Sequence, residues 1–232
     1  MNKHFIFYHI FFETNWFDIV SEQLLRLHTS GLLKNSELKV GVVFGAGINK
    51  ELDLGKLNSL LEQYYNYEIL YVEPTGSFGE STTLGRLSDF CFSGAENKKI
   101  LYIHTKGITQ YNSIREKPVA EWRRMMEYFL IDNWEKCVEK LDSGYDCCGI
   151  NYQNHAANIK GGTKLIKIYN GNFFWVNSNY IKKLDKSILF EHRYSAENWL
   201  LNLEEHKAFS FLDVPPIFDL YYNIYEDYKI LG

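Results

Sequence analysis

The chain has 232 residues, of which 46% are hydrophobic and 23% charged, and its formal net charge is -4. This size and composition fit one domain, residues 1–232, with a core that needs no disulfide or metal for stability. The negative charge disfavours nucleic-acid binding, and because no segment reaches the roughly 18 uninterrupted apolar residues of a spanning helix, we expect no transmembrane segment.

Short apolar runs alternate with amphipathic stretches through the first half of the chain, about residues 1–115. Strands are predicted at 4–12, 38–45, 67–76 and 99–104, and helices at 15–30, 55–65 and 81–92. This alternation predicts an α/β fold with a mostly parallel central sheet flanked by helices. Ligands of such sheets bind at the carboxyl ends of the strands, so we expect a site there.

The second half, about residues 116–232, has a different pattern. One long or two short helices are predicted over 117–142, and strands over 145–152, 167–178 and 208–216. A polar, glycine-bearing loop is expected between the first two of these strands. Helices are expected to begin near Asn177 and Ser195, and the aromatic tail from Phe218 is predicted to form a docked helix.

The four cysteines are Cys91, Cys137, Cys147 and Cys148. They lack the spacing of metal ligands, and two adjacent cysteines cannot form an ordinary disulfide. We therefore expect reduced core residues in a cytoplasmic protein.

The strand at 99–104 ends in His104-Thr105-Lys106-Gly107, at the predicted edge for a ligand. A lysine supplies a compact positive charge, and backbone N–H groups near a glycine can approach an anion closely. This pattern favours a phosphate contact, and the alternative is a polar turn closed by a glycine.

Three further segments carry candidate ligand contacts. Glu197 in "SAENWL" is a candidate general base, or a carboxylate that only stabilises the start of a helix. Asn172 and Trp175 in "NGNFFWVN" suit sugar hydroxyls and rings, or belong to a core strand with a glycine bulge. Arg123 and Arg124 cannot share one helix face, so one of them faces a cleft or both are solvated.

These segments together resemble a family of small bacterial and algal-virus glycosyltransferases with the GT-A fold. The matching motifs are the "HTKG" strand end, "WR" followed by "MEYF" in the helix, "GNFFW", and "YSAENW". The resemblance covers about residues 4–215. It implies a GT-A-like sheet, a nucleotide-diphosphate sugar donor (UDP-, GDP- or dTDP-linked), and a glycan or lipid-linked glycan acceptor in the synthesis of a surface polysaccharide.

The resemblance also implies roles for individual residues. The catalytic base would be Glu197, and an inverting reaction is favoured because a base candidate exists. Acceptor contacts would be Arg123, Asn172, Trp175 and Trp199. The donor would lie over the strand ends, near His9, Phe11, Gly45, Glu73, Thr82, His104, Lys106 and Gly107.

In broader GT-A enzymes an Asp-x-Asp motif that holds a divalent metal occupies the position of His104-Thr105-Lys106. We expect Lys106 to supply part of the metal's charge. Mn²⁺ or Mg²⁺ could still bind through His104 or a carboxylate such as Glu73 or Glu80, so the metal ligands stay unassigned.

Two other classes of protein remain as alternatives. One is a non-catalytic module that binds nucleotide sugars or glycans, which the missing Asp-x-Asp motif favours. The other is a dinucleotide-dependent enzyme, which the absence of Gly-x-Gly-x-x-Gly after the first strand disfavours. A lipid-linked acceptor would bring this cytoplasmic protein to the inner face of the membrane.

Overall fold

The computed structural model describes residues 3–64, 66–74, 79–159, 162–192, 194–215 and 218–230. Its central sheet has seven strands in the order β3-β2-β1-β4-β8-β5-β9. The bounds are β1 His4–Phe12, β2 Ser36–Phe44, β3 Tyr67–Glu73, β4 Lys99–His104, β5 Cys147–Gly149, β8 Phe174–Asn177 and β9 Ala208–Ser210. All neighbouring strands run parallel except β8, which is antiparallel to both β4 and β5. The predicted fold class, an α/β fold with a mostly parallel central sheet flanked by helices, is confirmed.

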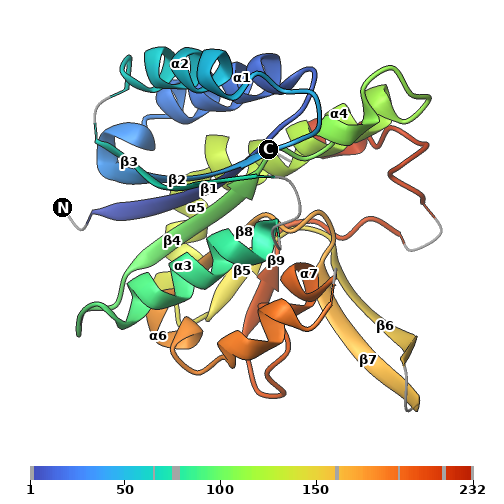
Figure 1. Cartoon of the computed structure of the whole chain (residues 1–232). Coiled ribbons are helices and arrows are strands. Elements are labelled where there is room, and N and C mark those ends of the chain that lie inside the picture. The colour runs from blue at the N-terminus through green and yellow to red at the C-terminus, as the bar shows by residue number, and fades with distance from the viewer. Residues whose placement is uncertain are drawn as a thin grey trace.

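Helices cover both faces of this sheet (Figure 1). One face carries α1 Trp16–Thr29, α2 Lys50–Leu61, α4 Glu116–Glu127 and α5 Trp134–Asp142, and a π-helical turn, Tyr128–Asp132, joins the last two. The other face carries α3 Glu80–Phe92, α6 Ser178–Ile181 and α7 Ser195–Trp199. Short 3-10 helices occur at Leu33–Asn35, Ile108–Gln110, Lys186–Phe190 and Asp227–Ile230.

The strand β1 lies inside the sheet and is apolar on both sides. Ile6, Tyr8 and Ile10 face the core under α1, whereas Phe7 faces the core under α3, and all four are fully buried. This explains why "HFIFYHIFF" is a continuous apolar run, as expected for a strand covered on both faces. From β1 the chain moves outward through β2 to β3, then returns to place β4 on the other side of β1. The strand order therefore reverses between β1 and β4.

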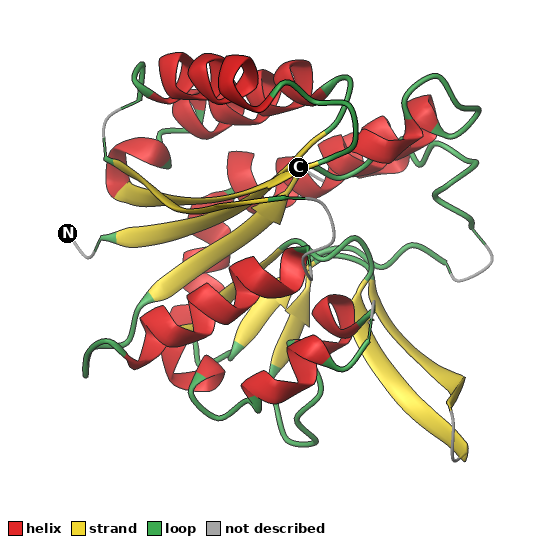
Figure 2. Ribbon diagram, viewed as in Figure 1, coloured by secondary structure: helices red, strands yellow, loops and turns green. Residues whose placement is uncertain are grey.

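Two predicted elements in the second half differ from the structure. The expected polar loop is a hairpin of β6 Tyr152–Ile159 and β7 Gly162–Tyr169, which extends away from the main sheet (Figure 2). The predicted strand 167–178 is divided between two sheets. Gly171 and Asn172 have φ values of +104° and +57°, so the backbone turns there and ends any continuous strand.

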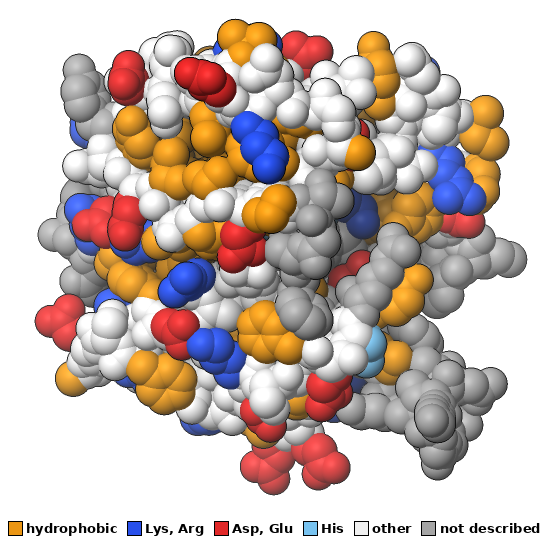
Figure 3. Space-filling model, in the orientation of Figure 1, with side chains coloured by type: hydrophobic (Ala, Val, Ile, Leu, Met, Phe, Trp, Pro, Cys, Tyr) orange, Lys and Arg blue, Asp and Glu red, His pale blue; other side chains and the backbone are white. Residues whose placement is uncertain are grey.

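The tail prediction was also wrong in part, because the described residues 218–226 form turns and irregular chain, not a helix. Leu220 and Tyr228 of this segment are buried against the body of the protein. The four cysteines are unpaired and buried, as expected. Within the described ranges, no helix is both long and apolar enough to cross a bilayer. Acidic and basic side chains are interspersed over the face drawn in Figure 3.

Candidate functional site

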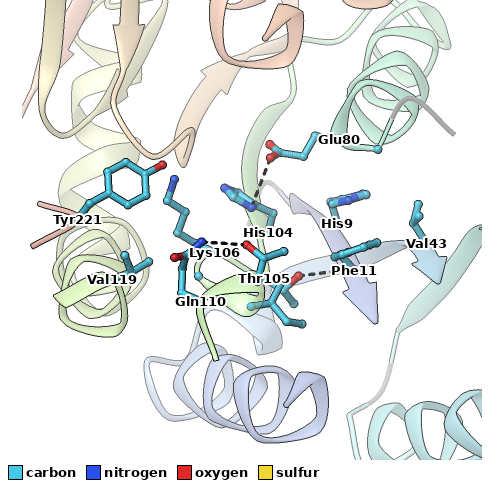
Figure 4. Close-up of a pocket in the computed structure, with 14 residues that line it drawn as sticks. His9, Phe11, Val43, Glu80, His104, Thr105, Lys106, Gln110, Val119 and Tyr221 are labelled. Carbon is cyan, nitrogen blue, oxygen red and sulfur yellow. Dashed lines mark hydrogen bonds and ion pairs between the residues drawn. The ribbon is translucent and has the colours of Figure 1, made fainter. Parts of the chain in front are cut away.

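A cavity of about 460 Å³ opens at the carboxyl ends of β1 and β4. This is the point at which the strand order reverses, where open α/β sheets bind their ligands, and the volume suits a small-molecule site. Its walls come from β1, β2, the first residues of α3, the turn after β4, α4 and the C-terminal segment (Figure 4). Of the predicted donor residues, the lining includes His9, Phe11, His104, Lys106 and Gly107.

The turn after β4 is held rigidly between β1 and α4. The Thr105 hydroxyl accepts a hydrogen bond from the Phe11 N–H (3.0 Å), and the Thr105 N–H donates to the carbonyl of His9 (3.2 Å). Gly107 has a φ of +87°, and a Cβ there would lie 2.7 Å from Cγ1 of Val119. Both its conformation and its close packing therefore require glycine.

Lys106 extends its ammonium group along the cavity wall. Its Nζ lies 4.2 Å from the ring centroid of Trp122 and 5.7 Å from that of Tyr221, both cation–π contacts. In the part of the chain that the structure describes, no carboxylate forms a salt bridge with Lys106. Its positive charge is thus available to an anion in the cavity.

Arg123 supports this turn and does not reach the cavity as an acceptor contact. Its side chain is 5% exposed, and it donates to the carbonyl of Lys106 (3.0 Å) and to Glu22 (3.0 Å). Its Nε lies 3.4 Å from the carboxylate of Glu127. The predicted acceptor role is therefore wrong, because the guanidinium is buried and faces the Lys106 carbonyl and two carboxylates inside the protein.

Glu80, the first residue of α3, places a carboxylate in the cavity. Its Oε2 accepts hydrogen bonds from the Tyr102 hydroxyl (3.1 Å) and the Asn172 side-chain amide (2.8 Å). Burial favours the neutral acid, but His104, His9, Asn172 and Lys106 outweigh this effect and hold the pKa of Glu80 below its usual value. The group is therefore an ionised carboxylate in a fixed orientation.

His104 lies between Glu80 and Lys106. Its Nε2 is 2.9 Å from the carbonyl of Gly171, and because a carbonyl only accepts, Nε2 carries the hydrogen. Its Nδ1 is 3.6 Å from Oε1 of Glu80, too long for a hydrogen bond. Burial lowers the pKa of His104 more than Glu80 raises it, so the imidazole is neutral at pH 7 and Nδ1 presents a lone pair.

His9 forms the far side of the same polar cluster. Its Nδ1 lies 2.9 Å from the hydroxyl of Thr83, which is also hydrogen-bonded to Tyr71. Burial lowers the pKa of His9 to about 4, so this ring is neutral. The cavity floor therefore has two neutral imidazoles, and one of them, His104, lies between the carboxylate of Glu80 and the ammonium of Lys106.

Asn172 reaches the cavity only indirectly. Its amide donates to Glu80, and its side chain is largely buried, so it orients the carboxylate and does not offer a free amide to an acceptor. The carbonyl of the preceding Gly171 fixes His104. The "GNF" segment thus supports the cavity floor from the side of β8.

Trp175 and Trp199 were predicted to contact the acceptor, and both predictions are wrong. Both side chains are 0% exposed, so neither ring offers a face to a sugar. Trp175 donates to the carbonyl of Leu130 (2.8 Å), and Trp199 to that of Asp185 (3.0 Å). Their indole N–H groups are satisfied inside the protein, which is the pattern of core tryptophans.

The remaining predicted residues are not among those that line the cavity. Glu197 is in α7, which packs against α3, so its role as a base stays a prediction. Gly45 follows β2, where a Cβ would lie 2.5 Å from the carbonyl of Phe12. Thr82 and Glu73 contact each other across 3.5 Å at the ends of α3 and β3.

A metal centre made of side chains alone is not found among the described residues. Among the described residues, no three His, Cys, Asp or Glu side chains come together as a ligand set. In addition, Oε2 of Glu80 is already occupied by two hydrogen-bond donors. A role for Mn²⁺ or Mg²⁺ stays a prediction.

Among the cavity residues, Glu80 was expected from the sequence only as a possible metal ligand, and Tyr221 had no expected role in the site. Glu80 follows a glycine and begins a helix, a place where a carboxylate is ordinarily explained by the helix dipole. Tyr221 belongs to the tail, and only the tertiary fold brings it beside Lys106. No short motif marks either residue.

The fold and the site together define an α/β protein with a ligand cavity at the switch point of its sheet. Residues 7–213 match the model of a family described as Domain of unknown function (DUF8361). The match covers most of the chain, and the protein belongs to this family. No curated protein matches the sequence.

Solved structures with a similar arrangement are distant in sequence. HddC from Yersinia pseudotuberculosis aligns over 92% of this chain and 91% of its own, with 13% identity and a TM-score of 0.45. A putative nucleotide-diphospho-sugar transferase from Desulfovibrio desulfuricans aligns over 92% and 81%, with 9% identity and a TM-score of 0.44. A 4-diphosphocytidyl-2C-methyl-D-erythritol synthase aligns over 90% and 89%, with 10% identity and a TM-score of 0.37.

Proposed function

We propose that the protein is a glycosyltransferase that moves a sugar from a nucleotide-diphosphate sugar to a hydroxyl of a glycan acceptor, with inversion. The observation that carries this proposal is the ammonium of Lys106, which faces the cavity next to the tight turn at Gly107. A lysine ammonium is a compact positive charge that suits a diphosphate. The cavity at the β1/β4 switch point supports the same substrate class.

The proposed reaction places negative charge on the leaving diphosphate. The bond between the sugar C1 and the phosphate oxygen breaks with its electron pair on that oxygen, and Lys106 stabilises the resulting charge. The acceptor oxygen bonds to C1 and gives its proton to a base. Glu197 keeps its predicted role as this base, and the packing of α7 against α3, whose first residue lines the cavity, supports it.

The first experiment is a thermal-shift screen of the protein with UDP-, GDP- and dTDP-sugars, each with Mn²⁺ or with EDTA. A ligand that binds the native state raises the unfolding temperature, and at a given concentration the rise is larger for a tighter ligand. We expect a shift with one nucleotide that persists in EDTA. A shift that requires Mn²⁺ would keep the enzyme class but overturn the proposal that Lys106 suffices, and no shift with any donor would refute the function.

Two variants test the proposed roles. Lys106→Ala should weaken donor binding by about 10- to 100-fold, the usual worth of a charge-assisted contact. Arg124→Ala is its control, because Arg124 lies on the outer face of α4 and pairs with Glu22 and Glu121. Glu197→Gln should keep donor binding and lose at least about 100-fold in turnover. Full turnover in Glu197→Gln would refute the base assignment.

A binding module that does not catalyse transfer is the second candidate. It is favoured by one observation, the burial of Trp175 and Trp199, which leaves no tryptophan ring for an acceptor at those positions. Release of nucleoside diphosphate from a bound donor, measured over time, separates the two candidates. The binding module would hold the donor intact.

A further inference from the structure

The charges of the cavity are separated in space. Glu80 and Lys106 lie on opposite sides of His104, and both side chains line the same cavity (Figure 4). With His9 and His104 neutral, these two groups are the ionised side chains of the cavity lining in the described chain. The cavity therefore has a negative end at α3 and a positive end at the turn after β4.

Hydrogen bonds hold the carboxylate of Glu80 in one orientation. Two donors, Tyr102 and Asn172, converge on Oε2 and fix the plane of the carboxylate. Neither donor is a cation, and the facing Nδ1 of His104 is too far for a hydrogen bond. Its side chain is 24% exposed, on the cavity side. A carboxylate kept ionised without a bonded cation can attract positive charge that forms in the cavity.

Glycosyl transfer develops charges with this same separation. As the bond from C1 to the diphosphate breaks, the diphosphate gains negative charge and the sugar ring becomes positive, like an oxocarbenium ion. Glu80 and Lys106 line the same cavity, so a donor whose diphosphate binds at Lys106 can place its sugar at Glu80. Fixed charges aimed at developing charge in a partly enclosed site are the strongest general source of rate enhancement.

We propose that Glu80 is a catalytic residue that contacts the donor sugar and stabilises the positive charge on its ring during transfer. This role rests on the proposed function. The step is the one already given: the electron pair of the breaking bond stays on the diphosphate, the acceptor oxygen bonds to C1, and its proton passes to Glu197. Glu80 neither gains nor loses a proton in this step.

The substitution Glu80→Gln removes the negative charge of this side chain and keeps its size and shape. In Glu80→Gln, the amide oxygen can take the place of Oε2 and keep the hydrogen bonds from Tyr102 and Asn172. The amide N–H₂ then faces the lone pair of His104 Nδ1, a favourable donor–acceptor pair. The matched control is Asp89→Asn, which removes one negative charge from the same helix at a surface ion pair with Lys186.

The experiment measures two quantities in the wild type, Glu80→Gln and Asp89→Asn. One is the affinity for the free nucleoside diphosphate (UDP, GDP or dTDP, as the thermal-shift screen selects). The other is the rate at which nucleoside diphosphate is released from the corresponding nucleotide sugar, with water as the acceptor. Thermal unfolding of each variant is recorded alongside.

We expect Glu80→Gln to lose at least about 100-fold in the release rate, as for other groups that stabilise transition-state charge. Its affinity for the nucleoside diphosphate should rise, by up to about 10-fold, because a like charge near the anion is gone. Asp89→Asn should match the wild type in both quantities. This opposite change in rate and affinity would not follow from a merely structural role.

Two results would overturn the proposal while leaving the function intact. One is a Glu80→Gln protein with the wild-type release rate. The other is a parallel loss of rate, affinity and unfolding temperature, which would show that Glu80 only supports the fold. A wild-type protein that binds no nucleoside diphosphate and releases none would instead refute the proposed function, and the role of Glu80 with it.

Discussion

The two halves of the chain use their polar and aromatic residues differently. In the first half, residues at strand ends, such as His9, His104 and Lys106, line the cavity. In the second half, the residues expected to meet an acceptor, Arg123, Trp175 and Trp199, are buried and hold the fold together. Position at the ends of the two central parallel strands, β1 and β4, therefore predicted which residues line the cavity, whereas residue type alone did not.

The physical reason is the geometry of the two kinds of strand. A parallel strand of an open α/β sheet delivers its last residues to one common edge, whatever their type. Trp175 lies within the short antiparallel strand β8, between β4 and β5, where both faces of the sheet are covered. A large side chain in such a place is most stable in the core.

The largest expected effect tests Trp175 as a core residue. Trp175→Ala should lower the free energy of unfolding by about 3–5 kcal/mol, because it leaves a cavity between β8 and the π-helical turn. Urea denaturation measures this loss. Phe92→Ala is the control, since that ring is 61% exposed and its removal should cost little. A stable Trp175→Ala protein would restore the ligand-contact interpretation.

Two adjacent arginines of α4, one buried and one partly exposed, allow the same comparison within one helix. Arg123→Ala removes a buried cation from Glu22 and Glu127 and should cost about 3–5 kcal/mol of unfolding free energy. Arg124→Ala breaks pairs at a side chain that is 43% exposed and should cost less than about 1 kcal/mol. Equal losses in the two variants would contradict the assigned burial.

A third prediction concerns how the free energy of unfolding depends on pH through His9, a cavity residue of the first half. Burial lowers the pKa of His9 from 6.5 to about 4, so between these values the unfolded chain binds a proton that the folded protein does not. Stability should therefore fall as the pH decreases from about 6.5 to 4, by about 3 kcal/mol from this group. His9→Gln should flatten that part of the curve of unfolding free energy against pH. An unchanged curve would show that His9 is not the source.

The smallest effect tests the turn that presents Lys106. Gly107→Ala should lower the unfolding free energy by about 1–3 kcal/mol, from its positive φ and the approach of Val119. Gly55→Ala is the comparison, because a Cβ at this helical glycine meets nothing within 4 Å and alanine favours a helix. Thermal unfolding of the two variants should shift in opposite directions.

Much of the fold could be predicted because the apolar runs are unambiguous. The strands β1, β2 and β4 are continuous apolar runs, and their order along the chain specifies parallel pairing through helical crossovers. The hairpin β6–β7 was missed because its central stretch, "QNHAANIKGGTK", has few apolar residues and no alternating apolar pattern.

The cavity was predictable where it follows from the sheet and unpredictable where it depends on tertiary packing. His104 and Lys106 follow directly from a strand end. The importance of Glu80 depends on Tyr102 and Asn172, which are 22 and 92 residues away in sequence. No pattern within one segment can specify that these donors converge on one oxygen.

The walls of the cavity come from two parts of the chain, and Tyr221 belongs to the second. The floor belongs to the sheet and to residues 7–213, which the family shares, whereas Tyr221 comes from the chain after that region. Its ring packs edge-to-face against Trp122, and the ring centroid lies 5.7 Å from Nζ of Lys106. A change in the tail can therefore alter this wall of the cavity without altering the residues of its charged floor.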